Sequence, residues 1–274
     1  MTETPRTPTA AVRIDLHALS DQGTGRDHNE DACGSLVESE TRAIVAVADG
    51  VSGQAGGEVA SQMAIEVLLR VCREETAKVG AAQRLYRAVQ QANIEVYDRA
   101  IAVPELRGMA TTLTAVAIDG GEATVVHVGD SRLYLVRDRT ITQLTRDHTV
   151  AAERARYGLL SKDKVSTHAD RCVLTRSVGR ELIVSRDRAM HRLEDGDVLL
   201  LCSDGLYTVL ADVEIEQAVR GRDAAGACRA LVDAANERGT PDNLTAAVVR
   251  ITGIAPPPER KTGFAARVRR LIGR

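Results

Sequence analysis

The sequence has very few aromatic side chains. Among its 274 residues there are five Tyr, one Phe and no Trp. Proteins that bind unpaired bases commonly stack them on aromatic rings, and the chain has little material for such a surface. Its net charge of −2 provides no general attraction to a polyanion either. We therefore expect no nucleic-acid partner.

Long apolar runs and paired cysteines are also missing. No stretch of about 18 consecutive apolar residues occurs, so no transmembrane span is expected. Residues 1–11 are rich in Thr and Pro without an apolar core, which predicts a disordered leader and no secretory signal. The cysteines are odd in number and widely spaced, which indicates free thiols and a cytoplasmic location. They are Cys33, Cys72, Cys172, Cys202 and Cys228.

The spacing of apolar residues predicts two helices followed by dense strands. Apolar side chains at intervals of four favour helices over 57–72 and 81–100. The apolar stretches 111–119, 123–130 and 132–138 are separated by Asp-Gly-Gly and Gly-Asp-Ser corners, which favour turns. We expect these three strands to form an antiparallel meander.

The second half of the chain repeats this mixture. Residues 148–171 are polar and irregular with a short helical stretch, which indicates a surface insertion. A strand at 198–202, a helix at 224–236 and a strand at 245–251 follow. Strand-rich stretches interrupted by helices predict an α+β sandwich formed by a single domain over residues 12–252.

Three apolar runs end at an aspartate. AIVAVADGVSG (43–53), VVHVGDS (125–131) and VLLLCSDG (198–205) stop at Asp49, Asp130 and Asp204. One Asp-Gly pair is an ordinary turn signal. An ionised carboxylate at the inner end of a strand, however, needs water, a cationic partner or a metal. The repetition of the pattern favours a shared acidic site.

The residues around these acids favour hard cations. Carboxylates without neighbouring His or Cys ligands select Mg²⁺ or Mn²⁺ over zinc. Asp242, in the segment GTPDN just before the last strand, is a fourth candidate. Gly50 follows Asp49 and has no Cβ, so its carbonyl could approach a metal closely.

Arg26 lies in the segment GTGRDHNED (23–31), close to Glu30 and Asp31. Arginine suits bidentate binding of a phosphate, and on a strand its side chain would project beside an acidic site. A surface ion pair of Arg26 with Asp27 or Asp31 explains the segment equally well.

These segments resemble the metal-dependent protein phosphatase (PPM) family, the type 2C serine/threonine phosphatases, and in particular its bacterial members. The matching stretches occur in family order over residues 14–251. They are SDQGTGRDHNED (20–31), VADGVSGQAGGEVAS (47–61), GMATTLTAVAI (108–118), HVGDSRLYLVRDRTITQLTRDHT (127–149), VLTRSVG (173–179), LCSDGLYTVL (201–210) and GTPDNLTAAVVRI (239–251).

The resemblance implies a central antiparallel β-sandwich flanked by helix pairs, with two Mn²⁺ or Mg²⁺ ions at one end. It assigns Asp49 to both metals, the Gly50 carbonyl to one of them, and Asp204 and Asp242 to the other. Its remaining assignments are Glu30 and Asp31 acting through water or from behind the direct ligands, Arg26 holding the phosphoryl group, a third and weaker ion between Asp130 and Asp204, and a variable flap at 148–171.

The implied reaction is hydrolysis of phosphoserine and phosphothreonine in proteins. A water that bridges the two ions would attack phosphorus in line, without a phosphoenzyme. The expected partners are phosphoproteins, among them a bacterial serine/threonine kinase and its targets. The alternative is a pseudophosphatase, an adaptor that binds phosphoproteins with weak or no turnover.

Two positions depart from the family pattern. Val51 stands where many relatives have a His, so no imidazole can protonate the leaving group there. Ser52 replaces a glycine, and a Cβ at this position would strain the loop if its φ is positive. A strained or shifted loop would lower the activity of the protein.

The C-terminal segment 253–274 differs from the rest of the sequence. A Pro-rich linker precedes a stretch, 259–274, with six basic residues against Glu259. Its apolar residues fall at helical spacing, which indicates a helix that docks on a membrane surface or partner. The alternatives are a helix that folds back on the acidic body and a solvated tail. The apolar residues are Phe264, Val268, Leu271 and Ile272.

Overall fold

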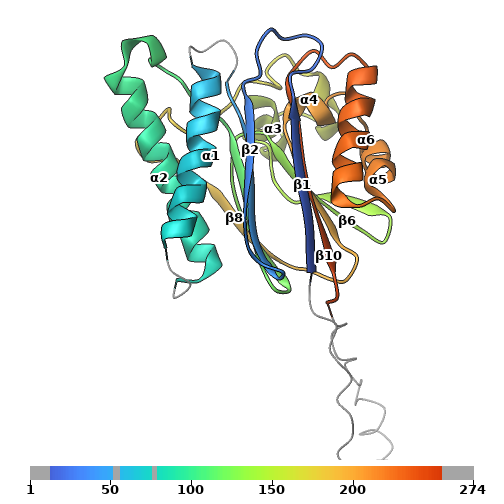
Figure 1. The fold of residues 1–274 in the computed structure, drawn as a ribbon. Helices are drawn as coiled ribbons and strands as arrows, with labels where there is room; N and C mark the ends of the chain where they lie inside the picture. The colour runs from blue at the N-terminus through green and yellow to red at the C-terminus, as the bar shows by residue number, and fades with distance from the viewer. Residues whose placement is uncertain (1–12, 52–55, 76–78, 255–274) are drawn as a thin grey trace, which may run out of the picture.

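The computed structural model describes residues 13–51, 56–75 and 79–254, which form two five-stranded antiparallel sheets with helices on their outer faces (Figure 1). The strands are β1 (Arg13–Asp21), β2 (Asp31–Ser39), β3 (Arg42–Asp49), β4 (Leu113–Asp119), β5 (Glu122–Val128), β6 (Arg132–Arg137), β7 (Thr140–Gln143), β8 (Asp187–Arg192), β9 (Val198–Cys202) and β10 (Leu244–Thr252). The helices are α1 (Gly57–Glu74), α2 (Ala81–Ala102), η1 (Pro104–Leu106), α3 (Val150–Arg156), η2 (Lys162–Thr167), α4 (Asp204–Tyr207), α5 (Asp212–Val219) and α6 (Ala224–Glu237).

Four layers build the molecule. One sheet has the order β1-β10-β9-β6-β7 and the other β2-β3-β4-β5-β8. Helices α1 and α2 pack on the second sheet, whereas α5 and α6 pack on the first (Figure 1). A third apolar cluster fills the space between the sheets. This arrangement confirms the predicted α+β fold with a central sandwich flanked by helix pairs.

The burial of β3 explains its unbroken apolar sequence. Ile44, Ala46 and Ala48 belong to the cluster beneath α1 and α2, while Val45 and Val47 face the other sheet. Successive side chains of a strand point to opposite faces, so a strand covered on both sides must be apolar throughout.

The predicted meander is wrong at its second turn. Strands β4 and β5 pair as expected, but β6 pairs with β7 and β9 in the other sheet. The corner between β5 and β6 carries the chain across the sandwich. Gly129 in this corner has a φ of 107°, and a Cβ there would meet the Thr112 side chain at 2.6 Å. The corner thus requires glycine at this position.

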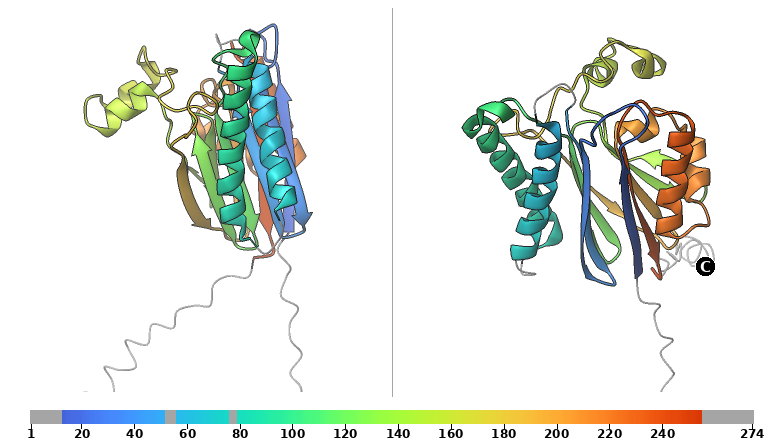
Figure 2. Two further views of the ribbon diagram at one scale, coloured as in Figure 1. Left: turned by 90° about the vertical axis from the view of Figure 1, so that its left-hand side faces the viewer. Right: turned by 45° about the horizontal axis from the view of Figure 1, so that its top comes forward.

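The helices agree closely with the sequence patterns. Helices α1, α2 and α6 lie within two residues of their predicted limits. Segment 148–171 contains the short elements α3 and η2 and projects from the sandwich, as expected of a surface insertion (Figure 2). The sequence patterns do not predict β7, β8 or α5. Within the described ranges, none of the helices has both the length and the apolar character needed to cross a bilayer.

The antiparallel order brings several acidic residues to one end of the sandwich. Asp31 begins β2 and lies opposite Asp49 at the end of β3. Strand β9 ends at Cys202, two residues before Asp204, and its partner β10 begins just after Asp242. In an antiparallel pair, the end of one strand lies beside the start of the next. The topology therefore collects acids that are far apart in the sequence.

Stability should depend on the apolar layer between the sheets. Leu201 is fully buried there, so Leu201→Ala should lower the free energy of unfolding by about 2–5 kcal/mol in denaturant titrations. Leu159 is 77% exposed, and Leu159→Ala serves as the control with an expected change within about 0.5 kcal/mol. Equal effects of the two substitutions would contradict the assigned core.

Candidate active site

Asp49 is fixed at the end of β3 by two threonines. Its backbone N–H donates to Thr112 Oγ1 over 2.9 Å, and its carbonyl accepts from Thr111 Oγ1 at 2.8 Å and from the Thr112 N–H at 2.8 Å. Thr112 Oγ1 in turn lies 2.6 Å from Ser131 Oγ, next to Asp130. The backbone of Asp49 is therefore held while its carboxylate is left to face the pocket.

Asp204 and Asp242 are brought together by a close backbone approach. Asp204 begins α4, and Gly205 follows it. A Cβ at Gly205 would collide with the carbonyl oxygen of Asn243. Only glycine allows the start of α4 to lie directly against the start of β10.

Gly50 is required for a similar reason. A Cβ on Gly50 would clash with the backbone of Gly57, at the start of α1, and would lie 2.8 Å from the carbonyl oxygen of Glu30. The Gly50 N–H donates to the same oxygen over 3.0 Å. Close packing thus accounts for the glycine whether or not its own carbonyl contacts a metal.

Asp31 is buried behind Asp49, Asp204 and Asp242. Its Oδ2 accepts hydrogen bonds from Ser203 Oγ at 2.6 Å and Thr245 Oγ1 at 2.7 Å, whereas Oδ1 is buried without a hydrogen-bond partner. Burial, reinforced by the charges of Asp204 and Asp242, raises the pKa of Asp31 to about 7 despite these hydrogen bonds. An unpartnered buried carboxylate oxygen is costly unless a cation or water contacts it.

The pKa values of the other aspartates in this group are raised as well. Burial and the charges of Asp31, Asp204 and Asp130 raise the pKa of Asp49 well above its usual value. Burial and the charge of Asp204 do the same to Asp130. The pKa of Asp204 rises to about 6, through burial and then the charge of Asp242. Like charges in a shared buried site disfavour ionisation of each member.

Arg26 lies beside the acidic group, but its local structure and its ion-pair partner both differ from the sequence expectations. It lies in the loop between β1 and β2, not on a strand, and its Nη2 donates to Asp242 Oδ2 at 2.8 Å. The expected ion-pair partners Asp27 and Asp31 are therefore wrong. The guanidinium stands at the edge of the acidic group, where it contacts one of the four predicted aspartates.

Asn243 holds the loop that carries Arg26 and Glu30. Its Oδ1 accepts from the Glu30 N–H at 2.9 Å, and its Nδ2 donates to the carbonyls of Gln22 and His28, both at 2.8 Å. No feature of the sequence pointed to a role for Asn243. A buried side-chain amide whose donors and acceptor all contact the backbone of one loop fixes the conformation of that loop.

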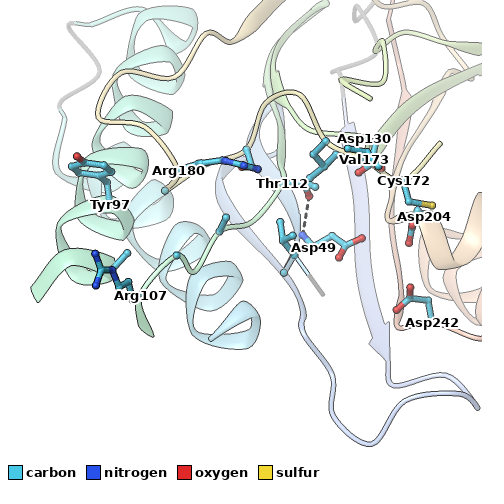
Figure 3. A pocket seen from close by; sticks show the side chains of 18 of the residues that line it. Asp49, Tyr97, Arg107, Thr112, Asp130, Cys172, Val173, Arg180, Asp204 and Asp242 are labelled. Atoms are coloured by element: carbon cyan, nitrogen blue, oxygen red, sulfur yellow. Dashed lines mark hydrogen bonds between the residues drawn. The ribbon is translucent and has the colours of Figure 1, made fainter. Parts of the chain in front are cut away.

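The acids line a pocket with a volume of about 1160 Å³ (Figure 3). Asp49, Asp204 and Asp242 lie around one part of it, and Asp130 is nearby. Of the predicted site residues, Arg26, Asp49, Gly50, Asp130, Asp204 and Asp242 line this pocket. Glu30 and Asp31 do not, which agrees with a position behind the inner wall.

The acidic group fits divalent cations that retain water. Among residues 13–51, 56–75 and 79–254, no three Asp, Glu, His or Cys side chains are arranged to hold one ion by themselves. Mg²⁺ usually keeps several waters and takes only one or two carboxylates. Hard oxygen donors, raised pKa values and the unpartnered Oδ1 of Asp31 all match such ions.

Val51 is described by the structure, whereas the second position that departs from the family pattern is not. Val51 lines the pocket and donates its N–H to the Ala110 carbonyl at 3.0 Å, so no imidazole occupies its place. Ser52 lies outside the described residues, as do the leader and the segment 259–274. All five cysteines are free thiols, as predicted, and Cys202 is fully buried as an apolar filler.

Comparison with known proteins identifies the protein family of the chain. The Protein phosphatase 2C family matches residues 24–248. A serine/threonine phosphatase, stp, from Listeria monocytogenes is 35% identical over 240 residues, which cover 85% of this chain and 95% of that protein. The chain therefore belongs to the protein phosphatase 2C family, the PPM serine/threonine phosphatases.

Solved structures agree with this assignment. The serine/threonine phosphatase PstP/Ppp of Mycobacterium tuberculosis superposes with a TM-score of 0.79 at 32% identity, covering 88% of this chain and 99% of that one. A catalytic domain of PstP in complex with two manganese ions gives a TM-score of 0.77 at 32% identity, covering 88% and 100%. The predictions of the family, the fold and the enzyme class are confirmed.

The repulsion among the acids predicts a pH-dependent stability when metal is removed. A carboxyl whose pKa is raised by folding prefers its proton in the folded state. Stability is therefore greatest below the ordinary carboxyl pKa and falls as pH rises through the folded value, by at most about 1.4 kcal/mol per pH unit and group. In EDTA, the free energy of unfolding should fall between pH 4 and about 7.

Asp31→Asn tests the source of this slope. The amide oxygen can still accept from Ser203 and Thr245, but it carries no charge. Denaturant titrations in EDTA should show a shallower decline for this variant than for the wild type. Identical slopes would show that the titration of Asp31 does not cause the decline in stability.

Proposed function

We propose that this protein hydrolyses phosphoserine and phosphothreonine monoesters in other proteins with the aid of Mn²⁺ or Mg²⁺. The observation that carries the proposal is the convergence of Asp49, Asp204 and Asp242 around one pocket whose rim holds Arg26. Such a group is electrostatically unfavourable without cations, and a phosphoryl substrate needs both cations and an anion-binding arginine. Membership of a metal-dependent phosphatase family supports it.

The proposed ligands are the predicted ones. Asp49, the Gly50 carbonyl, Asp204 and Asp242 would hold the two core ions, and Asp130 with Asp204 would hold a weaker third ion. Glu30 and Asp31 would act from behind through water. When bound, the ions supply a nucleophilic water and neutralise charge that develops on the phosphoryl group.

Arg26 is proposed to orient the phosphoryl oxygens. A guanidinium has five N–H donors, and within the described residues only Nη2 is used by another side chain, that of Asp242. The remaining donors can bind a phosphate, and Asp242 fixes the direction of the fork. The loop is in turn held by Asn243.

The overall reaction requires no covalent enzyme intermediate. One P–O bond forms to water, the bond to the serine or threonine oxygen breaks, and a proton from water ends on that oxygen. With Val51 at the pocket wall and no His among its lining residues in the described ranges, solvent water delivers the proton.

The proposed substrates are proteins phosphorylated by a bacterial serine/threonine kinase, including the kinase itself. The five free thiols suit a cytoplasmic enzyme.

We assign the activity to a domain over residues 12–252, with the flap at 148–171 and the Pro-rich linker and basic tail at 253–274 outside the catalytic body. The presence of every predicted carboxylate favours turnover over the pseudophosphatase alternative.

Replacement of one acid tests the proposal. Asp204→Asn should lower Mn²⁺-dependent hydrolysis of p-nitrophenyl phosphate by at least about 100-fold, because the neutral amide is a poor ligand for a hard cation. EDTA should abolish wild-type activity, and excess Mn²⁺ should restore it. Asp233→Asn, on the exposed face of α6, is the matched control. Equal rates for the wild type and Asp204→Asn would remove the enzyme assignment.

A further inference from the structure

The pocket that contains the acids extends well beyond them. Its far wall consists of Tyr97 and Ile101 from α2, Arg107 after η1, and Arg180 in the loop before β8. In Figure 3, Tyr97 and Arg107 lie on the side opposite Asp204 and Asp242, and the Arg180 side chain extends toward the acids. One continuous pocket therefore has an acidic end and a basic end.

Among the residues that the structure describes, the two arginines at the basic end have no anionic partner. Within the described ranges, neither Arg107 nor Arg180 forms an ion pair or a side-chain hydrogen bond. Their sequence neighbours Glu105 and Glu181 do not pair with them either. Arg26, by contrast, is already bound to Asp242. The basic end thus presents two unneutralised guanidinium groups.

The backbone that carries Arg180 is clamped by a buried residue. Asn93 of α2 is fully buried; its Oδ1 accepts from the Gly179 N–H at 2.9 Å, and its Nδ2 donates to the carbonyls of Glu181 at 2.8 Å and Leu182 at 3.0 Å. These bonds fix the chain on both sides of Arg180. Because these three hydrogen bonds already order the backbone, a ligand that binds Arg180 loses less free energy to ordering of this loop.

Arg107 is also held in a defined turn. Its N–H donates to the Pro104 carbonyl at 3.2 Å, and the next residue, Gly108, has a φ of 82°. Met109 follows and is fully buried, with its N–H bonded to the Leu106 carbonyl at 2.9 Å. The exposed Arg107 side chain therefore stands on an anchored backbone.

We propose that Arg107 and Arg180 bind a second anionic group of the phosphopeptide substrate while its phosphoryl group lies at the acidic end. Either an acidic side chain or a second phosphorylated residue provides this group. The inference rests on the proposed phosphatase function and specifies its substrate class. Guanidinium groups bind carboxylates and phosphates through the same planar fork.

The expected effect is on binding, not on the chemical step. A contact remote from the phosphorus stabilises the substrate complex and the transition state equally, so it changes KM and leaves kcat unaltered. Both arginines are exposed to solvent, which limits the gain from each. We expect a roughly tenfold lower KM for acidic peptides from the two together.

The experiment compares three phosphothreonine peptides of one length. In the first the phosphothreonine is flanked on both sides by Asp, in the second by Asn, and in the third by Asn with one further phosphothreonine. The KM of the wild type should be about tenfold lower for the first or the third peptide than for the second. The double variant Arg107→Gln/Arg180→Gln should lose this preference, and the control Arg229→Gln, an exposed α6 arginine, should retain it.

The outcomes separate this inference from the proposed function. Loss of preference only for the Asp peptide identifies carboxylates as the second group, and loss only for the doubly phosphorylated peptide identifies phosphate. An unchanged preference in the double variant, or no preference in the wild type, overturns the inference. Wild-type hydrolysis of p-nitrophenyl phosphate is measured in parallel, because its absence counts against the phosphatase function alone.

A binding measurement keeps the inference testable without turnover. Fluorescence anisotropy of the labelled peptides is recorded on the Asp204→Asn background with and without the two arginine substitutions. Tighter binding of the acidic peptides that depends on the arginines supports the inference even in an inactive protein. Equal affinity for all three peptides contradicts it.

Discussion

Repulsion among buried carboxylates is the constraint on which the rest of the structure depends. Burial raises the pKa values of Asp31, Asp49 and Asp204, and the charges of neighbouring aspartates add to the effect. Within the part of the chain that the structure describes, Arg26 is the one arginine paired with the group, and it binds Asp242 at the edge. A fold that assembles such a group is stable with ionised side chains only if cations compensate the charge, so we expect metal binding and folding to be thermodynamically linked.

The scaffold around the acids is rigid because its contacts are backbone contacts. Thr112 fixes Asp49, and Asn243 fixes the loop of Arg26. Gly205 allows α4 to press against β10. Side chains that hold backbone segments in this way set the positions of the acids before any ligand arrives, which is the preorganisation that electrostatic catalysis requires.

Much of this arrangement could be predicted from the sequence. The apolar runs that end at Asp49 and Asp204 identified strand ends, because a strand buried on both faces must be apolar until it leaves the core. Helical spacing placed α1 and α2 for a similar local reason. The repetition of such strand ends favoured a shared acidic site, and the resemblance to a known family supplied the roles of its individual residues.

The remaining features depend on contacts between distant segments. The sequence places β5 and β6 as neighbours, yet the corner at Gly129 sends β6 into the other sheet. Arg26 and Asp242 are 216 residues apart, so local spacing wrongly favoured nearby partners. The most direct test is anomalous diffraction from crystals soaked in Mn²⁺: two peaks beside the Asp49 carboxylate, one also near Asp204 and Asp242, are predicted, whereas Mn²⁺ bound only elsewhere would contradict the account.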